Sequence, residues 1–469
     1  MSEFTAPDWI EPRPYQQEAI KSWLRTDGEG ILHMATGTGK TVTALLAASQ
    51  VAQSLETQPL LVVAVPYQHL VDQWAEDLEE FGADPVLAYQ SRTNWQPQLE
   101  RELLEFNQGV RDTCVVVITH RTLSMDAAQR TIKRATGPVM LIADEVHHLG
   151  ASHTQNALLE QFDLRLGLSA TPERWYDEEG TAALSSYFGD TVFEYGLEEA
   201  IDRGALCEYY YVPHVVELVD EEMDAYYRLS SKIAKHMNTD EEGEVNLEEN
   251  PALQQALFKR ARLVGTATQK LDILVDLLQR QSDISHSLVY CSDGSTGIEA
   301  DEGERHVDAT TARLRERGWR VERFTARESQ AEREQLIQDF EDGEIEILTS
   351  IRCLDEGVDI PATRSAYILA STSNPRQYVQ RRGRILRTHE NKDYAVIHDF
   401  VTVPSISGLP SALSGVERSS ERRLIKQELE RVSTFADAAL NHPDADVDGV
   451  PTTEGSLQAL KRQYDLLDA

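Results

Sequence analysis

Short apolar runs alternate with amphipathic stretches along the first 200 residues. Nearly every position in each run is apolar, rather than every second one, which is typical of parallel strands buried on both faces. We predict strands at 30–33, 60–65, 84–89, 114–120, 139–146 and 165–171, with helices at 14–23, 42–53 and 68–81. This alternation predicts a wound α/β domain with a mostly parallel sheet.

The pattern changes after residue 205 and then returns. Helices are predicted at 221–237 and 251–281, on either side of an acidic segment, 238–250. A second α/β pattern has strands at 286–291, 320–325, 344–350 and 364–370, and helices at 309–317, 329–340 and 374–387. One amphipathic helix, 416–441, lies in the tail. We therefore expect two α/β domains, 1–205 and 284–405, with a connecting strand and helical segment at 206–283 and a helical extension at 406–469.

The net charge of the chain argues against a simple prediction of nucleic acid as its partner. The chain has 79 acidic and 45 basic residues, a net charge of −34, and few lysines. Such a surface normally repels nucleic acid. Either the partner is not nucleic acid, or the protein works in concentrated salt, where a Debye length of about 3 Å at 1 M screens the charge. We hypothesise a haloarchaeal host.

The remaining composition favours a cytoplasmic protein. Four cysteines, Cys114, Cys207, Cys291 and Cys353, form no C-x-x-C pair and are expected to be reduced. The apolar runs are far shorter than the roughly 20 residues that a membrane span needs, and the N-terminus lacks secretory signal features. We expect no membrane partner.

A glycine-rich loop joins the first strand to the following helix. It comprises Ala35, Thr36, Gly37, Thr38, Gly39, Lys40 and Thr41. Glycines let the backbone wrap a phosphate, Lys40 would reach the β- and γ-phosphates, and the Thr41 hydroxyl would bind Mg²⁺. Met34 stands where the strict motif has a glycine, so an ordinary strand-to-helix turn is the alternative.

Two carboxylates follow the strand at 139–146. Parallel strands present their carboxyl ends to a ligand, so Asp144 is placed to hold Mg²⁺ and Glu145 to orient or deprotonate the attacking water. We expect His147 to relay hydrogen bonds and His148 to be structural. The alternative is an acidic turn without function.

Three further groups of residues allow two interpretations each. Arg13 and Gln16 could bind an adenine edge, or lie on the surface of a proline-started helix. Residues 169–171 could relay a nucleotide change, or form an ordinary turn. Gln380, Arg384 and Arg387 share one helical face, so they could face phosphates across a domain cleft or pair with the abundant carboxylates.

Taken in order, these motifs resemble the superfamily 2 helicase core of XPB-type and restriction-enzyme-type DEAD/DEAH members. Residues 35–41 resemble motif I, 144–147 motif II in a D-E-V-H spelling, and 169–171 motif III. Pro66 with Gln73 and Trp74 resembles motif Ia, and Val289 with Tyr290 motif IV. Residues 355–361 resemble motif V, and 380–387 motif VI. The resemblance runs from Arg13 to Phe400 and implies two RecA-like domains in tandem.

The resemblance also implies roles for individual residues. Arg384 and Arg387 would be arginine fingers, and Gln380 would bridge His147 and the γ-phosphate. Gly357 and Asp359 would meet the nucleic-acid backbone and the nucleotide. ATP with Mg²⁺ would bind in the cleft between the domains, and nucleic acid would cross the carboxyl ends of the strands.

We therefore expect an ATP-dependent DNA helicase or translocase. The amino-acid sequences of two segments, 168–181 and 352–361, are similar to those of stand-alone helicases of phosphorothioation-linked restriction or phage defence. Nuclease, defence or repair subunits are therefore candidate partners. The alternatives are a duplex-DNA remodelling translocase, an RNA helicase, and a regulatory subunit that binds ATP without unwinding.

Overall fold

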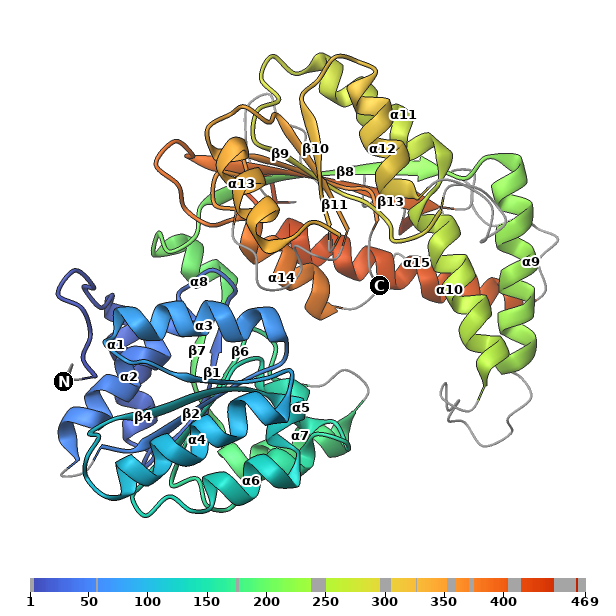
Figure 1. Ribbon diagram of the computed structural model, residues 1–469. Helices are drawn as coiled ribbons and strands as arrows, with labels where there is room; N and C mark the ends of the chain where they lie inside the picture. The colour runs from blue at the N-terminus through green and yellow to red at the C-terminus, as the bar shows by residue number, and fades with distance from the viewer. Residues whose placement is uncertain are drawn as a thin grey trace. The chain divides into compact units, whose positions relative to one another are not determined.

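The structure is a computed structural model that describes residues 4–55, 58–173, 177–237, 250–295, 305–325, 327–351, 360–370, 375–403, 415–442 and 461–462. The chain divides into two compact units, Met1–Arg203 and Gly204–Ala469. Each unit is built on one parallel sheet with helices packed around it (Figure 1). The predicted α/β class with tandem parallel sheets is confirmed.

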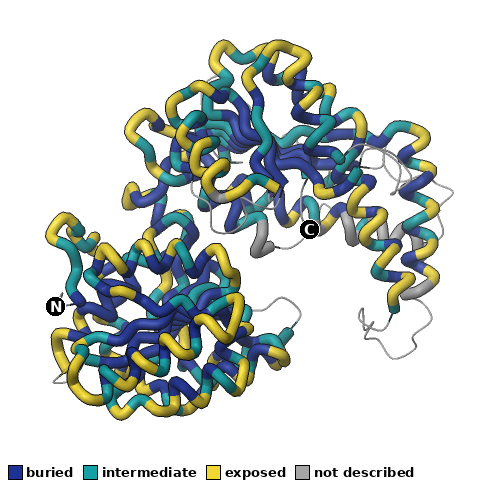
Figure 2. Tube along the Cα trace, viewed as in Figure 1, coloured by how far each residue is buried: buried dark blue, intermediate teal, exposed yellow. Residues whose placement is uncertain are grey.

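The first unit contains a seven-stranded sheet in the order β3-β4-β2-β5-β6-β1-β7. Its strands are β1 (Glu29–Met34), β2 (Leu60–Val65), β3 (Val86–Ala88), β4 (Cys114–Thr119), β5 (Val139–Ala143), β6 (Leu164–Ser169) and β7 (Thr191–Tyr195). Every residue of β2, β4 and β5 is buried, as the dark tube at the centre of the unit shows (Figure 2). Helices on both faces explain why these strands are apolar at successive positions.

The helices of this unit are α1 (Pro14–Leu24), α2 (Lys40–Ser54), α3 (Gln68–Glu80), α4 (Arg92–Asn107), α5 (His120–Leu123), α6 (Asp126–Ile132), α7 (Glu178–Phe188) and α8 (Leu197–Asp202), with short 3₁₀ turns η1 (Val146–Gly150) and η2 (Gln155–Ala157). Sequence analysis missed α4, which holds Pro97, a residue that usually ends helices. Its apolar side, Trp95, Leu99 and Leu103, packs into the core.

The second unit contains a six-stranded parallel sheet in the order β10-β11-β9-β12-β13-β8. Its strands are β8 (Glu208–Glu217), β9 (Ser287–Tyr290), β10 (Val321–Phe324), β11 (Ile347–Ser350), β12 (Ser365–Ile368) and β13 (Tyr394–Val403). The strand at the start of the expected connecting segment is β8, which pairs with β13 over its whole length and forms an edge of this sheet.

The helices of the second unit are α9 (Asp220–Met237), α10 (Pro251–Gly265), α11 (Thr268–Arg280), α12 (His306–Arg315), α13 (Gln330–Glu341), α14 (Pro375–Ile385) and α15 (Gly415–Asp437). The single helix predicted at 251–281 is wrong, because α10 ends at Gly265 and α11 begins at Thr268. Gly265 lies so close to Ser292 that a Cβ there would be 3.1 Å from the Ser292 Oγ.

The expected tail helix, α15, packs against α9 and β8. Its Arg431 pairs with Asp399 of β13 at 3.1 Å, with both side chains buried. The Tyr209 hydroxyl of β8 donates to the Phe435 carbonyl oxygen at 2.6 Å. The helix therefore forms part of the core of the second unit.

Cys114, Cys207 and Cys291 are unbridged and buried, while Cys353 lies outside the described residues. Within the described ranges, no helix combines the length and the apolar character that a bilayer crossing requires.

Candidate nucleotide site

The glycine-rich loop has a backbone that only glycine adopts without strain. Gly37 has a φ of 88° and Gly39 a φ of 77°, both in the left-handed region. Gly39 is also the N-cap of α2, which begins at Lys40. The first amide groups of a helix have no acceptor within the helix, so this turn presents donors suited to an anion.

Helix α1 supports the loop from outside. The Tyr15 hydroxyl donates to the Thr38 carbonyl oxygen at 2.8 Å, and the Gln16 amide nitrogen lies 3.5 Å from the Gly39 carbonyl oxygen. The Gln16 amide oxygen accepts the Arg13 N–H at 2.9 Å. Gln16 is buried and bonded to the chain itself, so an adenine contact by Arg13 and Gln16 stays a prediction.

Met34 fits the position where the strict motif has a glycine. Its side chain is fully buried at the end of β1, and its carbonyl oxygen accepts a hydrogen bond from Lys40 Nζ at 3.2 Å. The Thr38 hydroxyl donates to the Ala35 carbonyl oxygen at 2.7 Å. The buried Thr36 hydroxyl has no hydrogen-bond partner among the described residues, a state that a ligand oxygen would relieve.

Asp144 is held in place by an aromatic residue from another helix. The Trp74 indole N–H of α3 donates to Asp144 Oδ2 at 3.0 Å, and the other carboxylate oxygen accepts the Glu145 N–H at 2.9 Å. Glu145 has a φ of 45°, a conformation that costs a non-glycine residue about 1–3 kcal/mol and is concentrated at functional sites. This turn ends β5 at Ala143, three residues earlier than predicted.

His147 contacts the last residue of β6. Its Nδ1 lies 3.1 Å from Ser169 Oγ and 3.5 Å from Glu145 Oε2. Ser169 Oγ also accepts the Thr171 N–H at 3.1 Å. Both His147 and Ser169 are fully buried. His147, expected to relay hydrogen bonds, is therefore in direct contact with the segment expected to relay a nucleotide change.

His148 lies among other rings. Its ring centroid is 4.3 Å from that of His147 and 5.7 Å from that of Tyr67. Nearby, burial and the neighbouring His148 lower the pKa of His120 to about 3. This packing is compatible with the structural role expected of His148.

The register of the sheet brings these groups to one edge. In the parallel sheet β6 lies between β1 and β5, with His33 opposite Ser169 and Ala143 opposite Gly167. The glycine-rich loop, Asp144 with Glu145, and residues 169–171 therefore all lie at the carboxyl ends of neighbouring strands. Ligands bind at this edge in open α/β sheets.

The arginines at positions 381–387 of the second unit divide into two sets by their contacts. Arg381 donates to the Ala370 carbonyl oxygen at 3.0 Å, and Arg382 to the Thr434 carbonyl oxygen at 2.5 Å. These two buried arginines also lie over the rings of Tyr290 and Phe435, so they support the fold. Arg384 and Arg387 are half-buried.

Arg387 lies beyond the helix on which we expected it, because α14 ends at Ile385. Lys392 fixes the segment, since its Nζ donates to the carbonyl oxygens of Ile385 at 2.5 Å and Arg387 at 2.9 Å. Burial lowers the pKa of Arg387 to about 10. Gln380 is 2% exposed, and Asp359 lies outside the described residues.

The residues of the first unit fit a magnesium nucleotide. Thr41 and Asp144 offer hydroxyl and carboxylate oxygens, the hard ligands that Mg²⁺ prefers beside phosphate oxygens. Gly37 and Gly39 shape a loop that side chains at those positions would strain. Sequence reasoning missed the support given by Tyr15 and Trp74, because nothing in a sequence marks a hydrogen bond between residues far apart in the chain.

Two families match the chain. The family described as "Type III restriction enzyme, res subunit" matches residues 9–174, and "Helicase conserved C-terminal domain" matches residues 269–389. Together they cover the loop, Asp144, Glu145, Gln380, Arg384 and Arg387.

Among relatives, "DNA 3'-5' translocase XPB2" of Sulfurisphaera tokodaii is 27% identical over 84% of this chain and 82% of its own length. "Putative DNA 3'-5' helicase Rad25" of Haloarcula marismortui is 26% identical over 80% of this chain, which spans only half of that protein. The solved structure of the "ATP-dependent Type ISP restriction-modification enzyme LlaBIII bound to DNA" is 17% identical with a TM-score of 0.61. It covers 98% of this chain, which spans 32% of that one, and it supports the fold alone.

Proposed function

Because the chain belongs to the superfamily 2 helicases of the XPB-like and restriction-enzyme type, we propose that it couples ATP hydrolysis to movement along DNA. A nucleic-acid-dependent ATPase is the class that both matched families imply. The observation that carries the proposal is the edge of the first sheet, where the strained Glu145, the Trp74-held Asp144 and the glycine loop follow neighbouring strands.

Each residue of this edge has a proposed task, as have two arginines of the second unit. The amides at the start of α2 and Lys40 bind phosphates, while Thr41 and Asp144 hold Mg²⁺. Bound Mg²⁺ supplies charge neutralisation at the phosphates. Glu145 positions the attacking water and accepts its proton. Arg384 and Arg387 stabilise the charge that develops on the γ-phosphate.

A nucleotide-dependent signal would leave the site through His147. Its contact with Ser169 links the turn that carries Glu145 to residues 169–171, and Ser169 also holds the backbone of Thr171. A shift of Glu145 on hydrolysis would therefore be transmitted to residues 169–171. Gln380 is the proposed partner of His147 and the γ-phosphate.

DNA is the proposed track, as the names of the relatives suggest, with restriction, defence or repair as the setting. ATP and Mg²⁺ are the proposed cofactors, and nuclease or repair subunits are proposed partners. Adaptation to concentrated salt is proposed from the net charge of −34.

The experiment is ATP hydrolysis in about 2 M KCl, chosen for its charge screening. Wild type and Glu145→Gln are compared without nucleic acid and with single-stranded DNA, duplex DNA and RNA. We expect stimulation by DNA, and a loss of about 10²–10⁴-fold in the variant. Hydrolysis that no nucleic acid changes would overturn the motor and favour a regulatory ATP switch.

A further inference from the structure

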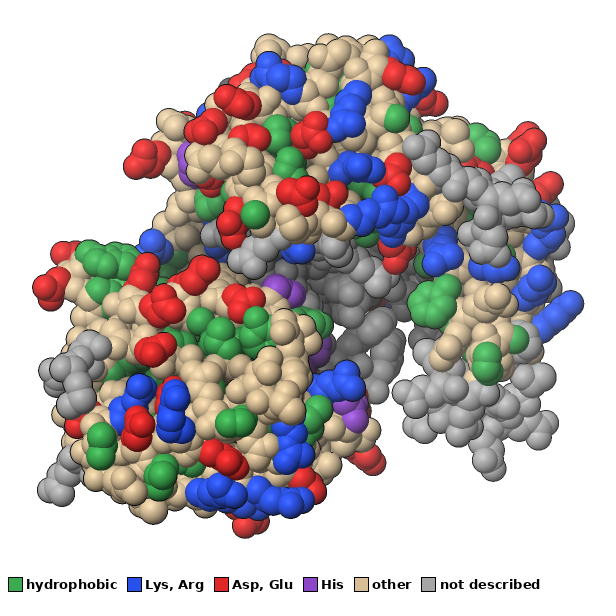
Figure 3. Space-filling model, in the orientation of Figure 1, with side chains coloured by type: hydrophobic (Ala, Val, Ile, Leu, Met, Phe, Trp, Pro, Cys, Tyr) green, Lys and Arg blue, Asp and Glu red, His purple; other side chains and the backbone are tan. Residues whose placement is uncertain are grey.

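A lysine inside the second unit closes the end of helix α14. Basic side chains are visible at the surface of both units in Figure 3, whereas Lys392 is 7% exposed. Its Nζ donates to three carbonyl oxygens, those of Ile385 at 2.5 Å, Arg387 at 2.9 Å and Pro361 at 3.3 Å. An ammonium group has three N–H donors, so each of them has an acceptor here. We call Lys392 with these three acceptors the lysine clamp.

The carbonyl groups at this end of α14 need a donor from outside the helix. The helix ends at Ile385, and the last carbonyl groups of a helix have no amide partner within it. A cation at this end also compensates the negative end of the helix dipole. Because the lysine clamp reaches Arg387, two residues further on, it sets the path by which the chain leaves the helix and the point from which the Arg387 side chain starts.

The first residues of the second unit hold the same segment. The chain enters this unit at Gly204. The Cys207 N–H donates to the Leu386 carbonyl oxygen at 2.8 Å, and Leu206 pairs with Arg387 in an isolated antiparallel bridge. Cys207 and Lys392 together bond the carbonyl groups of residues 385, 386 and 387. The main chain of Arg387 therefore has little freedom to shift while these bonds are made.

The third acceptor of the lysine clamp connects two motifs. Pro361 is the last residue of the segment that resembles motif V, and Arg387 is the last residue of the segment that resembles motif VI. One ammonium group bonds the ends of both segments. A displacement of either end would therefore break a hydrogen bond of the clamp or move the other end with it.

We propose that Lys392 is a positioning residue for ATP hydrolysis, whose ammonium group holds the main chain of Arg387 to the end of motif V at Pro361. The proposal rests on the proposed function, in which Arg387 stabilises the charge that develops on the γ-phosphate. Lys392 acts through Arg387, since its own donors are bonded to the chain. A misplacement of about 1 Å in a reacting geometry can lower a rate by about 10²-fold.

The charge state of Lys392 gives the lysine clamp a signature in pH. Burial lowers the pKa of Lys392 to about 8, and the nearby Cys207 thiol counters part of that shift. A neutral amine has two N–H donors and a lone pair, so above this pH one of the three carbonyl groups loses its donor. Hydrolysis should therefore weaken as Lys392 loses its proton.

Other titratable groups on the contacting segments are separated from Lys392 by their own behaviour. They are Cys207, Arg364, Arg384, Arg387, His389, Glu390 and Asp393. Burial raises the pKa of Cys207, and it lowers that of Arg387 to about 10. Both side chains therefore titrate at a higher pH than Lys392.

The lysine clamp is tested with Lys392→Gln, whose shorter side chain has two donors and no charge. ATP hydrolysis is measured at about pH 7 with DNA in about 2 M KCl, chosen for its charge screening. We expect kcat to fall by about 10²-fold with an unchanged KM for ATP, because the contact that suffers is made in the transition state. An unchanged kcat, or a rise in KM alone, would overturn the proposal.

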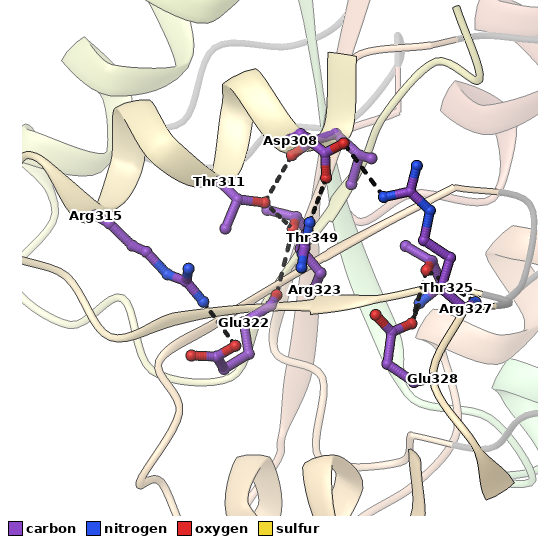
Figure 4. Close-up of polar contacts among 10 residues, drawn as sticks. Asp308, Thr311, Arg315, Glu322, Arg323, Thr325, Arg327, Glu328 and Thr349 are labelled. Atoms are coloured by element: carbon purple, nitrogen blue, oxygen red, sulfur yellow. Dashed lines mark hydrogen bonds and ion pairs between the residues drawn. The ribbon is translucent and has the colours of Figure 1, made fainter. Parts of the chain in front are cut away.

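Thr311→Val is the matched control, since it also removes a buried polar contact from the second unit. Thr311 Oγ1 lies 2.7 Å from Thr349 Oγ1, and the two residues join α12 to β11 (Figure 4). In the sheet order, β11 belongs to the half opposite β13 and β8. The control should lower the melting temperature and leave kcat near that of wild type. If it lowers kcat as much as Lys392→Gln does, general destabilisation explains the loss and the proposal fails.

The charge is tested by the pH profile of kcat in wild type, which does not depend on the folding of any variant. We expect kcat to fall above a pH of about 8, by about 10-fold per pH unit at first. The melting temperature at each pH separates this loss from unfolding. In Lys392→Gln the fall near pH 8 should be absent, whereas Cys207→Ala, which keeps the N–H to Leu386, should retain it. A wild-type profile that stays flat between about pH 7 and 9 contradicts the proposal.

The outcomes separate the lysine clamp from the proposed function. If Arg387→Lys lowers kcat but Lys392→Gln does not, the clamp is wrong and the arginine finger stands. If neither variant lowers kcat, Arg387 takes no part in hydrolysis and the proposal fails with that role. If DNA does not stimulate wild type but Lys392→Gln still lowers kcat and removes the fall near pH 8, the clamp stands without the motor.

Discussion

Trp74 and Asp144, which lie 70 residues apart in the chain, are joined by a hydrogen bond of 3.0 Å from the indole N–H to Oδ2. Sequence analysis matched Trp74 to motif Ia and placed Asp144 at the metal. The contact makes Trp74 a positioning residue for the carboxylate. Outer-shell partners of this kind orient a ligand and commonly contribute 10- to 100-fold to metal affinity or activity.

Trp74→Phe should therefore raise the Mg²⁺ concentration needed for half-maximal ATP hydrolysis by about 10-fold, because the ring is kept and the N–H is lost. The measurement is a Mg²⁺ titration of hydrolysis. Trp95→Phe, at a buried tryptophan in the core contact of α4, is the control. An unchanged titration would show that Asp144 needs no support from Trp74.

Arg387→Lys keeps the positive charge and loses the planar fork that matches a phosphate. We expect kcat for ATP hydrolysis to fall by about 10³–10⁵-fold, the range known for arginine fingers, with nucleotide binding retained. Arg384→Lys should behave alike. Arg313→Lys on the exposed side of α12 is the control. Near-normal kcat in either finger variant would remove that residue from the proposed site.

Acid should destabilise the protein through buried histidines. The pKa of His306 is lowered to about 4 and that of His398 to about 3, mainly because both side chains are buried. Both are neutral when folded, whereas the unfolded forms bind a proton below about 6.5. Stability is therefore full above pH 6.5 and falls as the pH drops, by about 1.4 kcal/mol for each histidine at pH 5.5.

The check is the melting temperature between pH 5 and 8 at fixed salt. In His306→Asn the amide oxygen can replace Nδ1, which accepts the Ser292 N–H, so the fold is kept and the acid loss becomes smaller. His153→Gln, at an exposed histidine, should follow wild type. The histidine account is contradicted if His306→Asn keeps the full acid loss.

Arg431→Leu should destabilise the second unit by about 3–5 kcal/mol, because the buried Asp399 carboxylate loses its counter-charge. The Tyr211 hydroxyl, which donates to Asp399 at 2.8 Å, would remain its neighbour. Denaturant unfolding measures the loss. The double variant with Asp399→Asn should recover part of it, whereas additive losses would count against a charge effect.

Dilute buffer should unfold the protein. Its net charge of −34 is screened over about 3 Å at 1 M salt but over about 10 Å at 0.1 M, so repulsion grows as salt is removed. We expect ellipticity and melting temperature to fall steeply below about 0.5 M KCl. Full stability in dilute buffer would refute the proposed adaptation to salt.

Sequence alone was sufficient for the fold class and for most strands. Continuous apolar runs such as 60–65 and 114–119 can be buried only between two layers of helices, so they specify a parallel sheet without further context. The loop at 35–41 was also predictable, because its glycines are needed by the local backbone. The domain limits and the roles of the site residues stay predictions.

Other features were decided by contacts between distant residues. Helix α4 forms despite Pro97 because Trp95 and Leu99 pack into the core, and the missing side chain at Gly265, the last residue of α10, leaves room for Ser292. The Trp74–Asp144 and Arg431–Asp399 pairs are long-range in the same way. Local propensity and periodicity record what a segment prefers by itself, whereas burial and hydrogen bonding depend on partners that only the folded chain brings together.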